Sequence, residues 1–307
     1  MKSLIAAARE GRILLSDGAW GTFLHAKGLG SGQCPELWNT ERPDSVLNVA
    51  ESYIRAGSDM IETNSFGGSP LKLIHYGLKD RAFELNEAAA AISRKAAGPD
   101  HWVLGSIGPT GKMLMMGDVT EEEMADGFRI QAEALEKGGA DAICIETMSA
   151  LDEAELAVRA ARESTRLPVV CTMTFDKTRS GAFRTMMGHS PADMMSKLKE
   201  MEVDGLGTNC GNGFENMIGI VREIRKADKD IPVLVHANAG APVIVDGETT
   251  FPETPNQMAA LIPQLADAGA DIVGGCCGTT PEHIRALRRA VDGLKDEPAL
   301  VCSHGGP

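Results

Sequence analysis

The sequence predicts a single-domain α/β fold, a (β/α)₈ TIM barrel whose parallel strands close on themselves and are each followed by a helix. Two observations lead to this prediction. Short apolar segments alternate with longer segments of helical spacing along the whole chain, and such alternation requires parallel strands joined by crossovers. The length of 307 residues also accommodates the roughly 250 residues that such a barrel needs.

The apolar segments are short enough to be strands, and there are enough of them to close a barrel. The expected strands cover residues 13–15, 60–62, 102–106, 142–146, 169–174, 205–209, 233–237 and 272–274. Helical spacing is evident in residues 121–137, 151–164 and 256–268. We expect the barrel to occupy residues 1–292 and a loose C-terminal tail to occupy residues 293–307.

An open doubly wound sheet is the alternative architecture for the same alternation. It predicts a glycine-rich dinucleotide turn early in the chain, but the segment 17–22 lacks the required glycine spacing. The closed barrel is therefore the favoured fold.

Composition and charge restrict the function. Lys and Arg number 30 against 43 Asp and Glu, and the resulting charge of −13 argues against a nucleic-acid partner. The N-terminal segment becomes charged too early for a signal peptide, and no apolar stretch is long enough to span a membrane. Seven cysteines without an export signal are typical of reduced thiols. We therefore expect a cytoplasmic protein.

Three cysteines are candidate metal ligands. Cys276 and Cys277 are adjacent and lie between glycines just after the eighth expected strand, and Cys210 follows the sixth strand next to another glycine. Three thiolates can hold a zinc ion and leave its fourth position open, as in a catalytic site. The alternative is that these cysteines are small buried apolar residues, which is the interpretation we adopt for Cys144 and Cys171.

The ion that these thiolates favour is zinc, because the three cysteines do not form the compact run of an iron–sulfur site. An open position on thiolate-bound zinc would bind and deprotonate a substrate thiol, whose pKa in the free state is about 8.5. The pattern thus indicates activation of a sulfur nucleophile.

Further polar residues stand at or just after other strand ends, which meet at one face of a barrel. Asp17 and Glu146 are candidates to bind an ammonium group, although a capping or solvent-exposed role is the alternative for each. Asn64 and Asn238 are candidates to bind substrate, or they stabilise loops. His236 lies within an apolar segment, where a histidine is more often a core residue.

The chain resembles the zinc-dependent homocysteine S-methyltransferase family, including the homocysteine-binding module of cobalamin-dependent methionine synthase. The resemblance spans most of residues 11–292. The segments that carry it are DGAWGT at 17–22, ETNSFG at 62–67, GSIGP at 105–109, ET at 146–147, GTNCG at 207–211, NAG at 238–240 and GGCCGTT at 274–280. The two cysteine segments are the most specific of these.

The resemblance implies that Cys210, Cys276 and Cys277 bind Zn²⁺. It also implies that Asp17, Gly18, Ala19 and Glu146 hold the amino-acid end of homocysteine. The zinc-bound thiolate of homocysteine would then attack an electrophilic methyl group and yield methionine.

The methyl donor remains open between several alternatives. The opening segments look more like the methionine synthase module, and the chain has no Asp-x-His-x-x-Gly corrinoid motif, so we expect methylcobalamin on a separate corrinoid protein. A sulfonium or betaine donor and a thiol acceptor other than homocysteine are the alternatives. A non-catalytic barrel subunit with a structural zinc is a further one, although structural zinc sites normally have four protein ligands.

Overall fold

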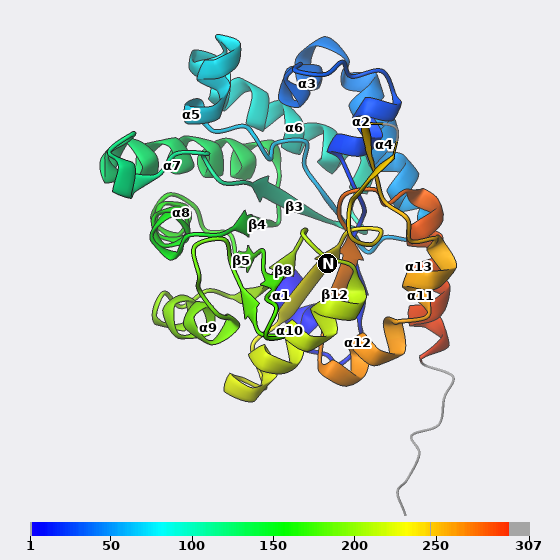
Figure 1. The fold of residues 1–307 in the computed structure, drawn as a ribbon. Coiled ribbons are helices and arrows are strands. Elements are labelled where there is room, and N and C mark those ends of the chain that lie inside the picture. The colour runs from blue at the N-terminus through cyan, green and yellow to red at the C-terminus, as the bar shows by residue number, and fades with distance from the viewer. Residues whose placement is uncertain (1, 246, 295–307) are drawn as a thin grey trace, which may run out of the picture.

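The computed structural model describes residues 2–245 and 247–294, and these form a parallel eight-stranded sheet curved into a barrel and surrounded by helices (Figure 1). The strand order in the sheet is β1-β12-β9-β8-β5-β4-β3-β2. The eight strands are β1 (Leu14–Leu15), β2 (Met60–Glu62), β3 (Trp102–Ile107), β4 (Ala142–Met148), β5 (Val169–Met173), β8 (Gly205–Asn209), β9 (Val233–Ala237) and β12 (Ile272–Gly275). The predicted TIM barrel and all eight of its strands are thereby confirmed.

Apart from an N-terminal helix that precedes β1 and covers the amino end of the strands, the helices follow the strands and cover the outside of the sheet (Figure 1). They are α1 (Leu4–Ala8), α2 (Gly21–Ala26), α3 (Trp38–Glu41), α4 (Pro43–Ala56), α5 (Pro70–Leu73), α6 (Ala82–Ala97), α7 (Glu121–Gly138), α8 (Leu151–Ser164), α9 (Pro191–Glu200), α10 (Phe214–Ala227), α11 (Pro255–Ala259), α12 (Ile262–Ala268) and α13 (Pro281–Gly293). None of the described helices is long and apolar enough to cross a membrane.

Two details of the helices and loops differ from the prediction. The expected helix at 256–268 is interrupted and forms α11 and α12, because Pro263 has no N–H to donate to the carbonyl group of Ala259. Two hairpins that were not predicted, β6–β7 (Asp176–Lys177 and Phe183–Arg184) and β10–β11 (Val243–Val245 and Glu248–Thr250), extend the loops after β5 and β9.

The predicted tail falls mostly outside the described part of the chain. Helix α13 ends at Gly293, and residues 295–307 lie outside the described residues. The boundary between residues 292 and 293 therefore remains a prediction.

The barrel closes between β1 and β2 through individual hydrogen bonds, and no strand ladder joins these two strands in the described residues. The N–H of Asp59 donates to the carbonyl oxygen of Leu15 at 2.7 Å, and the N–H of Leu15 donates to the Asp59 carboxylate at 2.8 Å. At the carboxyl end of the same seam, the N–H of Glu62 donates to the Asp17 carboxylate at 2.9 Å. Two aspartate side chains thus complete the barrel.

The barrel interior is apolar at one end and polar at the other. Alternate residues of a strand point to the same side, so Met60 and Glu62 share the interior side of β2 in the way that Cys144 and Glu146 share that of β4. Met60 and Cys144 belong to a buried apolar cluster that α1 covers at the amino end of the strands. The two glutamates line a pocket at the carboxyl end. The strand pattern itself therefore positions the polar site.

Close packing at this polar end depends on glycine. A Cβ atom on Gly207 of β8 would lie 1.8 Å from the carbonyl oxygen of Leu234 on the neighbouring strand, a distance that no side chain tolerates. Glycine at this position lets β8 and β9 approach closely next to the cysteine that follows β8.

Candidate functional site

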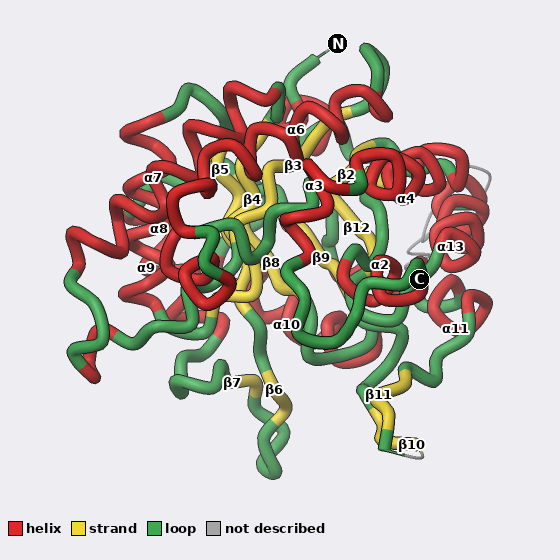
Figure 2. The backbone as a smooth tube through the Cα atoms, turned by 90° about the horizontal axis from the view of Figure 1, so that it is seen from above, coloured by secondary structure: helices red, strands yellow, loops and turns green. Residues whose placement is uncertain are grey.

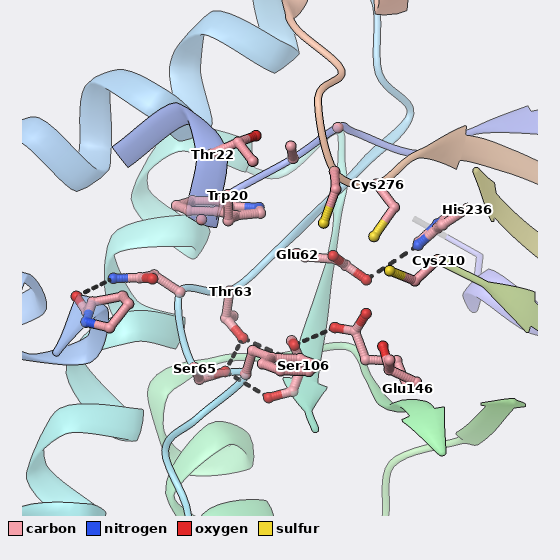
Figure 3. Close-up of a pocket in the computed structure, with 18 of the residues that line it drawn as sticks. Trp20, Thr22, Glu62, Thr63, Ser65, Ser106, Glu146, Cys210, His236 and Cys276 are labelled. Carbon is pink, nitrogen blue, oxygen red and sulfur yellow. Dashed lines mark hydrogen bonds and ion pairs between the residues drawn. The ribbon is translucent and has the colours of Figure 1, made fainter. Parts of the chain in front are cut away.

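A cavity of about 380 Å³ opens at the carboxyl ends of the strands. Residues from the loops or ends of β1, β2, β3, β4, β8, β9 and β12 line it, and they include all three candidate metal-binding cysteines. In a barrel this face collects residues that are distant in the sequence, which is why catalytic residues are found there. Figure 3 shows how the labelled side chains point into the cavity.

The three cysteine sulfurs converge at one side of this cavity. The Sγ atoms of Cys210, Cys276 and Cys277 all lie within 4.8 Å of one another, and they are the only group of this kind among the described histidines, cysteines and acids. Tetrahedral zinc with bonds of about 2.3 Å to sulfur separates its ligand sulfurs by roughly 3.8 Å. The three thiols are therefore close to the spacing that a single zinc ion requires.

A turn directly after β12 lets two adjacent cysteines face the same point. The strand ends at Gly275, and the N–H of Thr279 then donates to the carbonyl oxygen of Cys276 at 3.1 Å. The Thr279 hydroxyl donates to the same oxygen at 2.7 Å. The backbone thus departs from the extended conformation, and this removes the alternation that would send Cys276 and Cys277 to opposite sides.

The backbone at Cys210 is also unusual. This residue has a φ of 58°, in the left-handed region that side chains other than glycine rarely adopt, and its N–H donates to the carbonyl oxygen of His236 at 2.9 Å. Strained backbone of this kind concentrates at functional sites. Here it turns the thiol of Cys210 toward the two cysteines after β12.

The cysteines share hydrogen bonds that favour one thiolate. Hydrogen bonds from Cys276 and Cys277 lower the pKa of Cys210 to about 3. Contact with Cys210 raises the pKa of Cys277 to about 12 and raises that of Cys276 well above its usual range. This donor set fits zinc, because three thiolates surround one point that faces the cavity and leave room for an exogenous ligand. Cys144 and Cys171 are fully buried, as predicted for core residues.

Three buried carboxyl groups lie at the same end of the barrel as the sulfurs. Burial raises the pKa of Asp17 to about 7 and that of Glu62 to about 8, and burial together with the nearby Glu62 raises that of Glu146 well above its ordinary range. Burial lowers the pKa of His236, whose Nδ1 lies 3.3 Å from Oε1 of Glu62 (Figure 3). The site thus concentrates acidic groups, and a cation that enters the cavity would stabilise their ionised form.

Hydrogen bonds distinguish the three acids. Glu146 accepts hydrogen bonds from the Ser106 hydroxyl on one oxygen and from the Asn209 amide, at 3.1 Å, on the other. Asp17 does not line the cavity, and one of its oxygens accepts from the Trp20 indole at 2.9 Å and from the Glu62 N–H. Within the described residues, neither oxygen of the Glu62 carboxylate accepts a hydrogen bond, and Oε1 is buried. Glu62 is therefore the acid with the most freedom to bind a donor from a ligand.

The other predicted residues occupy different places around the cavity. Gly18 and Ala19 line it, and the Ala19 N–H donates to the Thr279 hydroxyl at 3.0 Å. Asn64 lines it as well, but its amide donates to the carbonyl oxygen of Pro35 at 2.8 Å and so also supports a loop. Asn238 does not line it; its amide contacts the Cys210 thiol.

Sequence reasoning missed several residues of the site. Glu62 ends an expected apolar strand just as Glu146 does, so the same sequence pattern identifies it. His236 is buried, as expected for a core residue, yet it also lines the cavity. Ser106 and Trp20 had no distinguishing sequence signal, because their importance arises from the partners that they contact across the barrel.

Comparisons with known proteins agree with this geometry. A family model described as Homocysteine S-methyltransferase matches residues 14–291. Methionine synthase from Mycobacterium tuberculosis is 34% identical over 302 residues, covering 92% of this chain and 25% of the relative. The Mycobacterium leprae methionine synthase is 33% identical over 303 residues, covering 93% of this chain and 25% of the relative. The chain thus spans about a quarter of the length of these relatives.

A solved structure is also similar to this chain. The metallated form of the homocysteine methyltransferase MmuM from Escherichia coli matches with a TM-score of 0.76 and 26% identity, covering 92% of this chain and 98% of that chain.

The fold and the site together define an α/β-barrel enzyme with a three-cysteine centre suited to zinc. More specifically, the chain belongs to the homocysteine S-methyltransferase family, which confirms the resemblance noted from the sequence. Membership of this family favours an enzyme over the non-catalytic zinc-binding subunit that was one of the alternatives.

Proposed function

We propose that this enzyme methylates the thiol of homocysteine to form methionine, with Cys210, Cys276 and Cys277 as the zinc ligands. The observation that carries the proposal is the convergence of three cysteine sulfurs within 4.8 Å at the wall of a cavity of about 380 Å³. When bound there, zinc would stabilise the thiolate form of a substrate thiol at neutral pH.

The acids of the cavity would orient the substrate. The ammonium group of homocysteine would lie near Glu62 and Glu146, because both line the cavity and Glu62 has no hydrogen-bond donor of its own. Asp17 would not contact the substrate. It would position Trp20 and Glu62 by accepting hydrogen bonds from the Trp20 indole and the Glu62 N–H. The carboxylate end would lie near Gly18 and Ala19. Asn64 and Asn238 would support the loops next to substrate and sulfur.

The reaction is a displacement at the methyl carbon. A bond forms between the substrate sulfur and the methyl carbon, and the bond between that carbon and the donor breaks, with its electron pair remaining on the donor. The role of the barrel residues is to hold the sulfur in line with the donor and to exclude water from the buried end of the cavity.

For the donor we propose methylcobalamin carried by a separate corrinoid protein. The identity of 34% and 33% to two methionine synthases, above the 26% identity to MmuM, supports this choice of donor. A sulfonium or betaine donor that binds directly in the cavity is the alternative. A cytoplasmic location is part of the proposal, because free cysteines persist in a reducing compartment.

The test measures zinc content and methyl transfer together. Anaerobically purified protein is assayed for zinc and mixed with methylcobalamin, with and without homocysteine, while the absorbance of methylcobalamin is followed. We expect about one zinc per chain and a demethylation that depends on homocysteine. Cys276→Ser should abolish both, and Cys171→Ala should retain both because its thiol lies in the core.

Two results would contradict the proposal. Retention of zinc and activity by Cys276→Ser would exclude the metal site. Zinc-loaded protein that forms methionine only from a sulfonium compound or betaine would exclude the corrinoid donor and leave the thiol activation intact.

A further inference from the structure

One buried side chain connects a cysteine of the cavity to one of its acids. Asn209 ends β8 immediately before Cys210, is fully buried and does not line the cavity. Strands β8 and β4 are not neighbours in the sheet, because β5 lies between them (Figure 2). The Asn209 side chain nevertheless reaches Glu146 on β4. It therefore joins a proposed metal ligand to a proposed substrate ligand across a third strand.

The amide of Asn209 uses its full capacity for hydrogen bonds. Its Oδ1 accepts hydrogen bonds from the Thr147 N–H and from the Thr172 hydroxyl, both at 2.7 Å. Its Nδ2 donates to the Thr147 hydroxyl at 2.7 Å and to Oε2 of Glu146 at 3.1 Å. An amide with two donors and two acceptor positions has no capacity left, so its orientation is fixed by β4 and β5 together.

Backbone strain marks both ends of this connection. Three described residues other than glycine have a positive φ, and two of them are Thr147 at 62° and Cys210 at 58°. A β-branched residue such as threonine is an outlier in this region. The pairing of β4 with β5 also shifts its register around Thr147, so Glu146 and Thr147 depart from the regular strand. The two hydrogen bonds between Asn209 and Thr147 hold this departure in place.

We infer that Asn209 is a positioning residue through which binding of zinc and binding of the amino acid strengthen each other. The inference rests on the proposed function and adds a link between its two halves. Cys210 shares a peptide group with Asn209, so a Cys210 side chain held by metal leaves Asn209 less freedom to turn away from Glu146. Of the two hydrogen bonds that hold Glu146, only that from Ser106 would remain without Asn209. An acid that is already held in place binds an ammonium group at a smaller entropic cost.

Coupling of this kind is reciprocal. If bound zinc raises the affinity for an amino acid by some factor, the amino acid raises the affinity for zinc by the same factor. For a link through one residue we expect about five- to tenfold, at the lower end of the usual range. A direct bond between a substrate thiol and the metal would add to this factor, so the probe must lack a thiol. L-2-Aminobutyrate has the amino-acid end of homocysteine and stops one atom before the position of the sulfur.

The experiment measures two dissociation constants for each form of the full chain. The Kd of L-2-aminobutyrate is determined by calorimetry on zinc-free and zinc-loaded protein. The Kd of zinc is determined by competition with a coloured chelator, with and without L-2-aminobutyrate. In the unmodified chain, zinc should strengthen the binding of L-2-aminobutyrate about five- to tenfold, and the reverse factor should be equal. Asn209→Ala should reduce both factors to about one, because the connection between the two sites is removed.

Thr172→Val is a milder second variant that keeps the test decisive if Asn209→Ala does not fold. It retains the shape of the side chain and removes the hydroxyl that donates to Asn209, and Thr172 does not line the cavity. It should lower both factors without abolishing binding. Asn86→Ala is the matched control, because Asn86 is also fully buried and its amide donates to the carbonyl oxygens of Gly68 and Ala82. It should lower stability and leave both factors unchanged.

Three results would overturn the inference, and they separate its failure from that of the proposed function. Equal affinity for L-2-aminobutyrate with and without zinc in the unmodified chain would exclude the coupling and leave the proposed function intact. Factors that persist in Asn209→Ala, or that Asn86→Ala removes as well, would exclude the role of Asn209. Normal zinc binding without any binding of L-2-aminobutyrate would exclude the amino-acid site of the proposed function and the coupling with it.

Discussion

Replacing Glu62 by glutamine tests the physical account of the buried acids. The carboxyl group of Glu62 is buried beside two other acids; its Oε1 lies 3.3 Å from Nδ1 of His236 and has no hydrogen-bond partner in the described residues. Glutamine has nearly the same shape as the protonated acid but cannot ionise. We therefore expect Glu62→Gln to stabilise the zinc-free protein at high pH and to leave its stability nearly unchanged at low pH.

The magnitude follows from the shift in pKa. Burial raises the pKa of Glu62 from its ordinary value of 4.5 to about 8. The folded state therefore retains a proton that the unfolded state loses, and the contribution of Glu62 to stability is lost as pH rises from 4.5 through about 8. At about 1.4 kcal/mol per pKa unit, the expected gain for Glu62→Gln at about pH 9 is roughly 2 to 5 kcal/mol.

The assay is equilibrium unfolding in guanidinium chloride, followed by circular dichroism with a chelator and a reducing agent present. Both proteins are measured at about pH 4 and about pH 9, so that the difference between them isolates the ionisation of residue 62. Glu163→Gln is the control, because Glu163 is exposed on α8. It should change the free energy of unfolding by less than about 0.5 kcal/mol at both pH values.

A difference in stability that is the same at both pH values would refute the reasoning, since it would mean that Glu62 ionises in the folded state as easily as in the unfolded chain. The same variant should also bind homocysteine more weakly than the unmodified protein does, because the proposed function uses this carboxylate for the substrate ammonium group. Calorimetric titration with homocysteine measures that loss. Glu62 would thus lower the stability of the zinc-free protein and be retained because substrate binding requires its carboxylate.

Three further predictions concern packing, orientation and the metal. Gly207→Ala should prevent folding or cost more than about 3 kcal/mol in a thermal or chemical melt, because its Cβ would lie 1.8 Å from a carbonyl oxygen of β9. Ser106→Ala frees one oxygen of Glu146 and should raise the KM for homocysteine several-fold with a smaller change in kcat; an unchanged KM would exclude this orienting role. Zinc added to the metal-free protein at neutral pH should release about two protons in an unbuffered titration. Cys210, with a pKa of about 3, is already a thiolate, whereas Cys276 and Cys277, whose pKa values are raised, each lose a proton. Release of three protons would contradict the shared hydrogen bonding.

The strands and the cysteine site were predictable from the sequence because each has a local signal. Buried parallel strands read as short apolar runs, and cysteines between glycines after such runs are rare enough to be specific. The seam between β1 and β2 had no such signal. It is closed by the side chains of Asp17 and Asp59, whose partners lie more than forty residues away in the chain.

The roles of the acids were only partly predictable. Glu62 and Glu146 both end an expected apolar strand, and only Glu146 was selected from the sequence. The structure separates them by their hydrogen bonds: Ser106 and Asn209 hold Glu146, whereas Glu62 has no donor in the described residues. Such partners come from other strands, and spacing along the chain does not reveal them.

The position of β12 has a consequence for biosynthesis. This strand carries Cys276 and Cys277 at its end and inserts between β1 and β9, so that nearly the whole barrel precedes it along the chain. A chain emerging from the ribosome therefore presents only the thiol of Cys210 from this site until residue 276 has been made, and a single thiol holds zinc weakly. Zinc capture at the proposed site would thus follow the synthesis and docking of the last strand, and chains that end before it would not retain the ion.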